Sequence, residues 1–164
     1  MKREILFRGK DSDGNWRYGF YGEHDDAVCI FEIERQISRR WYVDKNTVGQ
    51  YTGAKDKNGL MIFEGDIVKQ TFEKGSNIYD RDSLGFVDVE TIVKGYHVGV
   101  VSMTRYGVGM QSPIRRIEEA IDQAPSVSKS TRFVHIASYR SEVIGNIYDN
   151  PEMILSPYEA DESE

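Results

Sequence analysis

Basic residues surround two aromatic residues in the segment that follows the first predicted strands. Guanidinium and ammonium groups bind phosphates and aromatic rings stack on bases, so this interleaving is typical of a nucleic-acid surface. The alternative interpretation is an exposed strand edge, where charges discourage aggregation, and it is favoured because the body of the chain is nearly neutral. The candidate residues are Arg35, Arg39, Arg40, Trp41, Tyr42 and Lys45, with Arg115 and Arg116 as a further extension.

Three carboxylates lie in a glycine-rich central segment. Asp56, Glu64 and Asp66 stand on neighbouring predicted turns, where two of them could act as general acid and base. Acidic residues are equally common in surface turns, and Asp56 can cap its own turn. The sequence contains no recognisable catalytic constellation. We therefore predict no catalytic residues and no enzymatic activity, and keep a small enzyme using these carboxylates as the less favoured alternative.

Two further patterns could bind ions but fit turns better. His24, Asp25 and Asp26 precede Cys29, yet no spacing matches a known metal site, and a polar turn is favoured. Gly107 and Gly109 are too few, and too far from a predicted helix, for a phosphate-binding loop. We predict no metal and no cofactor.

The charge and the single cysteine indicate the class of protein. The net charge is −6, but the last nine residues contain four acidic and no basic residues, which leaves −2 for the rest. We expect residues 156–164 to be a disordered acidic tail. Cys29 is the only cysteine, which suits a reducing cytoplasm. No signal peptide and no apolar run of about 18–20 residues occurs, so we predict a soluble cytoplasmic protein that does not bind membranes.

Short β-strands with tight turns must position these residues. Ile5 and Phe7 alternate with Glu4 and Arg8, and the Asp11–Asn15 turn precedes a second alternating run, which predicts a hairpin. Further strands are expected over Val28–Ile33, Trp41–Val43, Leu60–Phe63, Ile67–Phe72, Phe86–Val93, Tyr96–Met103, Phe133–Tyr139 and Val143–Tyr148. In the last of these, Gly145 and Asn146 indicate a bulge or a close backbone approach. The buried residues are expected to include Ile62, Ile67, Val68, Ile144 and Ile147. The polar segment Glu73–Ser83 is predicted to be a mobile loop.

One segment has the pattern of a helix. Ser112 can cap it, Pro113 suits its first turn, and Ile114, Ile117 and Ile121 recur at helical spacing until Pro125. This predicts an α-helix over Ser112–Ala124. Its apolar face must be buried against the same chain or a second copy. The modest apolar content favours the second copy, because a small core gains stability from a partner, and we predict a homo-oligomer whose interface includes Ile114, Ile117 or Ile121.

Three sequence blocks resemble the YopX family of phage and prophage proteins, in the family's order. They are REILFRGKDSDGNWRYG (Arg3–Gly19), TVGQYTGAKDKNGLMIFEGDIVK (Thr47–Lys69) and EVIGNIYDNPEMI (Glu142–Ile154). The resemblance implies an N-terminal β-rich region over residues 1–46 and a C-terminal SH3-like small barrel over residues 47–155, here with a helical insertion near residues 112–124. It assigns no catalytic residues, and the long segment 71–140 departs from the family.

The fold class expected is therefore mainly β with one α-helix. The leading functional hypothesis is a phage-derived accessory or regulatory protein of the bacterial cytoplasm that acts by binding an unknown protein partner. A nucleic-acid-binding small barrel is the alternative.

Overall fold

The computed structural model describes residues 5–34, 37–121 and 123–154, and it is built almost entirely from antiparallel strands. The N-terminal strands are β1 (Phe7–Lys10), β2 (Trp16–His24), β3 (Ala27–Glu34), β4 (Ile37–Tyr42), β5 (Gly49–Lys55) and β6 (Met61–Phe63). The later strands are β7 (Asp66–Tyr79), β8 (Phe86–Thr104), β9 (Gly107–Met110), β10 (Ile114–Ala120), β11 (Ser126–Lys129), β12 (Val134–His135) and β13 (Ser141–Asn146). The helical segments in these ranges are three 3-10 turns, Lys45–Thr47, Ser138–Arg140 and Pro151–Ile154.

The first six strands form one sheet in the order β4-β3-β2-β1-β5-β6. The predicted first hairpin is confirmed, since Phe7 pairs with Gly19 and Lys10 with Trp16. Its turn is held by the Asp11 carboxylate, which accepts hydrogen bonds from the backbone N–H groups of Asp13 and Asn15. The resemblance implied a boundary after residue 46, whereas the sheet itself also includes β5 and β6.

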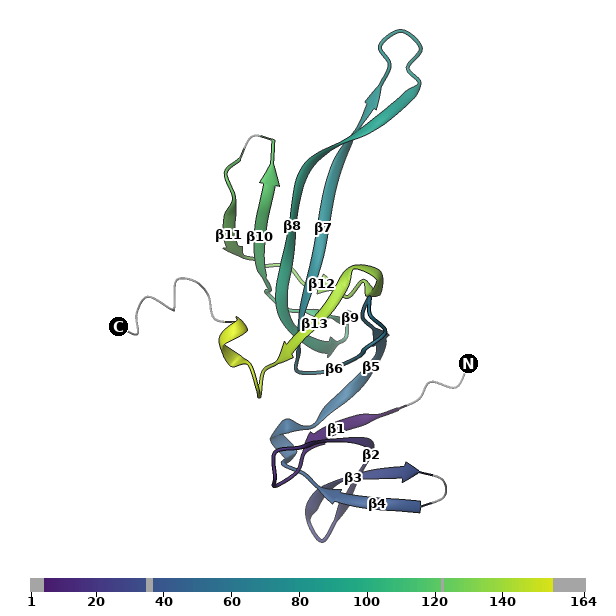
Figure 1. The fold of residues 1–164 in the computed structure, drawn as a ribbon, viewed down its shortest axis with the longest axis vertical. Coiled ribbons are helices and arrows are strands. Elements are labelled where there is room, and N and C mark those ends of the chain that lie inside the picture. Colours follow the sequence, from purple (N-terminus) through teal and green to yellow (C-terminus); the bar gives the residue numbers. More distant parts are fainter. Residues whose placement is uncertain (1–4, 35–36, 122, 155–164) are drawn as a thin grey trace, which may run out of the picture.

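The remaining strands form a second sheet in the order β11-β10-β8-β7-β13, and β9 links β8 to β12. Figure 1 shows the two sheets at opposite ends of an elongated molecule, with β5 and β6 beside the start of β7. The buried core of Ile62, Val68, Val101 and Met110 joins residues from both sheets. The protein is therefore mainly β with two antiparallel sheets, and the SH3-like barrel is not confirmed.

The predicted helix over Ser112–Ala124 is wrong. Ile114–Ala120 is strand β10, which pairs with β8 on one side and with β11 on the other. Ser112 has φ +48°, a left-handed conformation rather than the extended one of a helix N-cap. Pairing along both edges supplies more hydrogen bonds than a short isolated helix can keep, so tertiary context overrides the local pattern.

The predicted loop over Glu73–Ser83 is also wrong for most of its length. β7 continues to Tyr79, and β8 begins at Phe86, so the segment forms the far end of a long hairpin. The two strands predicted on either side of Gly95 are one strand. A Cβ at Gly95 would lie 2.1 Å from the carbonyl oxygen of Arg116, so glycine here permits β10 to pack closely rather than making a turn.

The predicted core is confirmed in its central part. Ile62, Ile67 and Val68 are fully buried. Ile144 in β13 and Ile147 just after it are half-buried, because β13 is an end strand of its sheet and this edge is covered on fewer sides. The register of β13 against β7 shifts between Val143 and Gly145, which confirms the predicted bulge.

Candidate functional site

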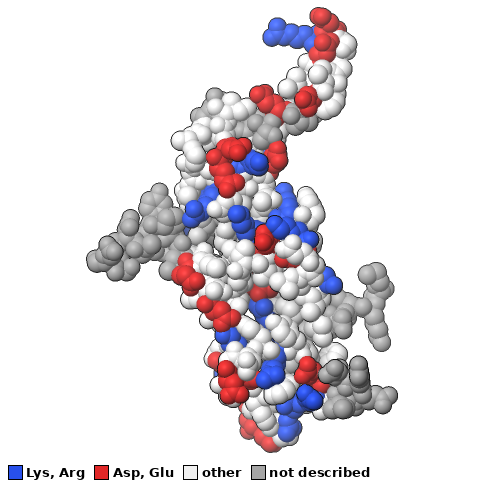
Figure 2. Space-filling model, in the orientation of Figure 1, with Lys and Arg blue, Asp and Glu red and all other residues white. Residues whose placement is uncertain are grey.

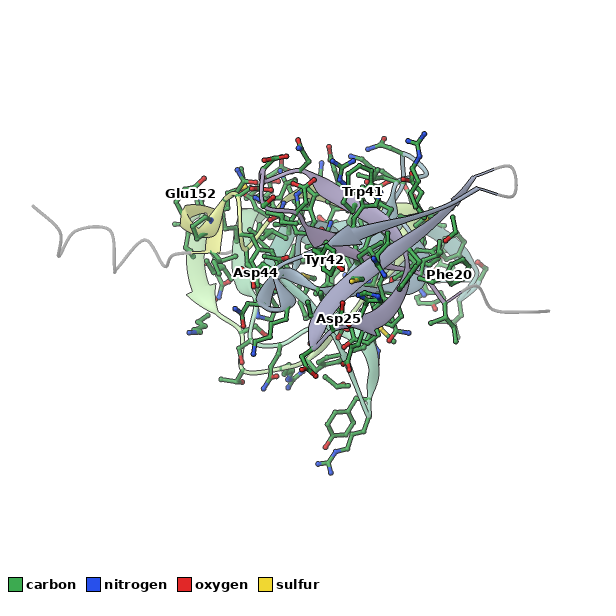
Figure 3. All side chains as sticks on the ribbon, turned by 90° about the horizontal axis from the view of Figure 1, so that it is seen from below. Phe20, Asp25, Trp41, Tyr42, Asp44 and Glu152 are labelled. Atoms are coloured by element: carbon green, nitrogen blue, oxygen red, sulfur yellow. The ribbon has the colours of Figure 1, made fainter. Side chains whose placement is uncertain are left out.

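The residues of the predicted nucleic-acid surface do not share one face. Strand pairing places Arg39 opposite Glu32 and Arg40 opposite Phe31, so successive residues of β4 point to opposite faces of the sheet. Arg39 and Trp41 therefore lie on one face, and Arg40 and Tyr42 on the other. Figure 3 shows Trp41 and Asp25 on opposite sides of Tyr42 at this end of the molecule.

Trp41 is occupied by its own neighbours. The Cζ atom of Arg17 lies 3.5 Å from the centre of its ring, and the indole N–H donates to Glu32. Lys45 is exposed on a 3-10 turn, and Arg35 lies outside the described residues. Arg115 and Arg116 belong to β10 in the other sheet and do not extend the patch.

The other sequence candidates hold backbone together. Asp25 and Asp26 both have positive φ and form the turn between β2 and β3, as the polar-turn interpretation predicted. Asp56 accepts hydrogen bonds from the N–H groups of Asn58, Leu60 and Val143, and these bonds keep its pKa low although burial opposes them. Glu64 accepts from the N–H of Met103. The described residues contain no group of three or more potential metal-binding side chains.

A buried ion pair connects the two sheets. The guanidinium of Arg8 on β1 lies 2.5 Å from the carboxylate of Asp66 on β7, and both residues are at least 94% buried. The Arg8 Cζ also lies 4.5 Å from the Trp16 ring centre and 5.0 Å from that of Phe63. Burial raises the pKa of Asp66, and the nearby Arg8 charge opposes this increase.

A second, more exposed ion pair, which we call the exposed clamp, lies beside the pair of Arg8 and Asp66. Lys10 forms an ion pair with Asp149, whose other oxygen accepts hydrogen bonds from the Trp16 indole and from the Asn146 side chain. These donors lower the pKa of Asp149 from 3.8 to about 2. Residues more than a hundred positions apart in the sequence thus hold the N-terminal sheet to the segment after β13.

A small cavity opens at this sheet junction. Its volume is about 220 Å³. We call it the junction pocket, and its lining residues are Arg8, Tyr18, Leu60, Met61, Phe63, Asp66 and Val143. All of these belong to the three sequence blocks that carry the family resemblance. The blocks are far apart in sequence and meet here in space.

The second notable feature is the far end of the β7–β8 hairpin, residues 75–91, which we call the β-arm. Among the described residues, its two strands pair only with each other, since β13 stops opposite Gln70 and β10 stops opposite Val93. Figure 1 shows the β-arm extending away from the rest of the second sheet. Every residue over the range 75–88 is exposed.

Large apolar side chains gather on the β-arm. Tyr79 and Phe86 form an edge-to-face ring pair across the two strands. Leu84, in the turn, is 78% exposed and has φ +55°, which is strained for a bulky residue. The Asp80 carboxylate holds this turn by accepting from Ser83, which lowers its pKa. The exposed apolar residues of the β-arm are Ile78, Tyr79, Leu84, Phe86 and Val87.

The charge of the β-arm is acidic. It contains four acidic residues and one basic residue, Arg81. Figure 2 shows the arm as a mainly uncharged surface with acidic side chains and a charged end. A groove of about 420 Å³ lies where the arm joins the sheet, and Phe72, Lys94, Tyr139 and Arg140 contribute to its walls.

The three isoleucines of the predicted oligomer interface differ in burial, because Ile114 and Ile117 belong to strand β10 and Ile121 follows it. Ile117 is 9% exposed, Ile114 is half-buried, and Ile121 is 53% exposed beyond the end of β10. They do not form the single apolar face that the helix would have presented. Self-association stays a prediction without that structural basis.

Sequence reasoning missed the burial of Arg8 and the part of β7 that belongs to the β-arm. Alternation with Phe7 placed Arg8 on the outer face of its strand, but the second sheet covers that face and leaves Arg8 6% exposed. The strand that begins at Phe86 was predicted, whereas the end of β7 is polar, has no buried face and lacks the alternation of apolar residues by which strands are recognised.

Comparisons with known proteins give a family and a distant structural likeness. Protein EF1440 from Enterococcus faecalis resembles the chain at a TM-score of 0.43 and 16% identity, over 94% of this chain and 100% of that one. A search of the curated proteins gives no match. No helix in the described ranges combines the length and apolar character needed to cross a bilayer. The family model for the YopX protein matches residues 18–155, which is most of the chain, and the protein therefore belongs to the YopX family.

Proposed function

We propose that this protein is a phage-type accessory or regulatory protein without enzymatic activity, and that it acts by binding another protein through the β-arm. Family membership supports a phage-type protein and specifies no activity. The observation that carries the proposal is the gathering of large exposed apolar side chains on a hairpin that projects from the sheet.

The physical argument is one of stability. A two-stranded hairpin in water is marginally stable unless a third strand or another surface covers it. Among the described residues, no third strand pairs with either strand of the β-arm, and strand edges of this kind can pair with an added strand. Its acidic balance favours a partner with basic residues. The partner is therefore a protein that adds an extended, apolar and basic segment to the β-arm.

Site-specific photocrosslinking in the bacterial host tests this proposal. A photoreactive phenylalanine analogue at Leu84 is expected to crosslink to one other protein, whereas the same analogue at Tyr106, 61% exposed on the β8–β9 turn, is expected not to. Phe86→Ser in the same chain should reduce the crosslink from position 84. Crosslinks that contain only this chain, or crosslinks of equal yield from both positions, would contradict the proposal.

The nucleic-acid alternative receives less support. Its arginines and aromatics lie on two faces of β4, and Trp41 is covered by Arg17. Homo-oligomerisation is a separate possibility for the β-arm, and the crosslinking experiment distinguishes it by the mass of the product.

A further inference from the structure

The two edges of the β-arm differ in regularity. The pairing of β7 with β8 shifts register twice, at either end of residues 75–78 of β7. At each shift β8 advances by two residues where β7 advances by one, so Val87 and Ile92 are extra residues of β8. A bulged strand bends and its ladder of backbone hydrogen bonds is interrupted, which protects its edge from further pairing. The edge of β7 has no such extra residue in the β-arm.

The two edges also differ in charge. Over residues 75–79, β7 has the sequence GSNIY and no charged residue. The facing part of β8 contains Asp88 and Glu90. Charged side chains along an edge strand discourage another strand from pairing with it. Bulges and charges therefore both protect β8, whereas β7 presents a regular and uncharged edge.

The edge of β7 in the β-arm is continuous with an existing pairing site. β13 pairs with the first part of β7 as far as Gln70. The 3-10 turn just before β13, Ser138–Arg140, lines the groove at the base of the β-arm together with residues 71–73 of β7. A strand added to β7 beyond Gln70 would therefore continue the line of β13, and its end would lie at this groove.

This groove, which we call the base groove, has room for a side chain of the added strand. Its volume is about 420 Å³, and sites for small molecules measure about 300–1,000 Å³. Phe72 and Tyr139 supply aromatic walls, and Tyr139 is 79% exposed. The lining also includes two acidic and two basic residues, whose charges balance. They are Glu73, Glu118, Lys94 and Arg140. A groove with aromatic walls and no net charge favours an uncharged, apolar side chain.

We infer that the partner's segment pairs as an added strand with the edge of β7, in line with β13, and places an apolar side chain in the base groove. This inference rests on the proposed function of the β-arm and adds which of its two edges is used. Backbone hydrogen bonds to β7 provide affinity, and the base groove selects the side chain at the end of the added strand. The edge of β8 does not contact the partner.

Photocrosslinking from the two flanks of the β-arm tests the inference. Tyr139 flanks the edge of β7, whereas Ile121, which is 53% exposed and directly follows β10, flanks the edge of β8. The photoreactive phenylalanine analogue at Tyr139 is expected to crosslink to the same protein as the analogue at Leu84. The analogue at Ile121 is expected not to crosslink to it.

The pattern of crosslinks separates this inference from the proposed function. Crosslinks from Leu84 and Ile121 without one from Tyr139 would overturn the choice of β7 and leave the proposed function intact. Equal crosslinks from both flanks, or a crosslink from Leu84 alone, would overturn the inference in the same way. Absence of the crosslink from Leu84 would overturn both.

Proline substitution tests the hydrogen bonds of the edge itself, because proline has no backbone N–H. Ser76 lies opposite Glu90, and Asn77 lies opposite Val89. In antiparallel strands such pairs alternate between bonding each other and pointing their N–H groups outwards, so one of these two pairs points outwards. In that pair, proline on β7 should reduce the crosslink from Leu84 by about two- to tenfold, the effect of one hydrogen bond. Proline on β8 should leave the crosslink unchanged.

Circular dichroism identifies the outward pair, since its proline variants keep the strand signal, whereas proline in the other pair removes bonds between β7 and β8. Equal reductions from the two strands of the outward pair would overturn the inference. If neither pair tolerates proline, the comparison of Tyr139 with Ile121 still decides.

Discussion

At the scale of single residues, two aspartates connect the sheets in different electrostatic environments. Asp66 is buried against Arg8, and burial raises its pKa. Asp149 is more than a third exposed and is surrounded by donors, which lower its pKa to about 2. For Asp66 the raised pKa means that its contribution to stability is largest at low pH and falls as pH rises through the folded pKa. For Asp149 the lowered pKa means that its contribution to stability is present at higher pH and is lost as pH falls through the folded pKa.

The exposed clamp predicts a pH-dependent difference between wild type and Asp149→Asn. The folded pKa of Asp149 is about 2 and its ordinary value is 3.8, so its stabilising contribution is present above about pH 4 and is lost as pH falls towards 2. Urea denaturation should show a less stable variant near pH 6 and equal stabilities near pH 2. Asp82→Asn on the exposed β-arm is the control, and it should change little at either pH. A difference for Asp149→Asn that persists at low pH would refute the role of its ionised carboxylate.

Burial predicts the cost of truncating the core. Ile67 is 0% exposed, and Ile67→Ala should lower the free energy of unfolding by about 2–5 kcal/mol. Ile78→Ala, on the β-arm and 42% exposed, is the matched control and should cost less than about 0.5 kcal/mol. Thermal or urea denaturation compares the two variants. Equal effects would mean that the β-arm is packed in solution.

At the scale of elements, β7 and β8 have two functions along their length. The first half of β7 and the second half of β8 are central strands of the second sheet, between β13 and β10. The second half of β7 and the first half of β8 form the β-arm and contribute little to the core, since every residue over the range 75–88 is exposed. The length of this hairpin therefore adds little to the stability of the fold, because its far end extends into solvent.

Removing the β-arm should therefore leave the fold intact. Joining Gly75 to Thr91 through an Asn-Gly turn keeps the pairing of β7 and β8 up to that point, and Asn-Gly suits a tight hairpin turn. Thermal denaturation should show a Tm within a few degrees of wild type, because a change of about 1 kcal/mol shifts Tm by roughly 2–8 °C. The shortened protein should also lose the crosslinked partner. Failure of the shortened chain to fold would show that the β-arm is structural.

At the scale of the whole molecule, two ion pairs join the N-terminal sheet to the second sheet and to the segment after β13. Arg8 with Asp66 and Lys10 with Asp149 both cross the sheet junction, and Trp16 contacts members of both pairs. Removing one partner of a buried ion pair leaves an uncompensated charge and costs about 3–5 kcal/mol. The junction is thus the part of the molecule where single changes affect both sheets.

Weakening the junction should separate the unfolding of the two sheets. Both tryptophans lie in the N-terminal sheet, so fluorescence reports on that sheet, while circular dichroism reports on all strands. The transitions should coincide in wild type. In Arg8→Ala/Asp149→Ala the fluorescence midpoint should fall below that of circular dichroism. Coincident transitions in the variant would mean that the core around Ile62 couples the sheets without these pairs.

The sequence alone determined the features that depend on neighbouring residues. The Asp11–Asn15 turn and the first hairpin follow from local hydrogen bonding and strand alternation, and the Gly145 bulge and the buried Ile62, Ile67 and Val68 follow from glycine and apolar patterning. The three blocks also identified the family.

Only the tertiary structure decided the features that depend on distant partners. Ile114–Ala120 has a helical pattern but becomes β10 because β8 and β11 pair with its edges. Arg8 is buried because a second sheet covers its face and supplies Asp66. The β-arm, in turn, is exposed because no other described segment packs on it. Burial and strand pairing join residues that are far apart in sequence, and local propensity contains no information about which distant segment will pack or pair with a given residue.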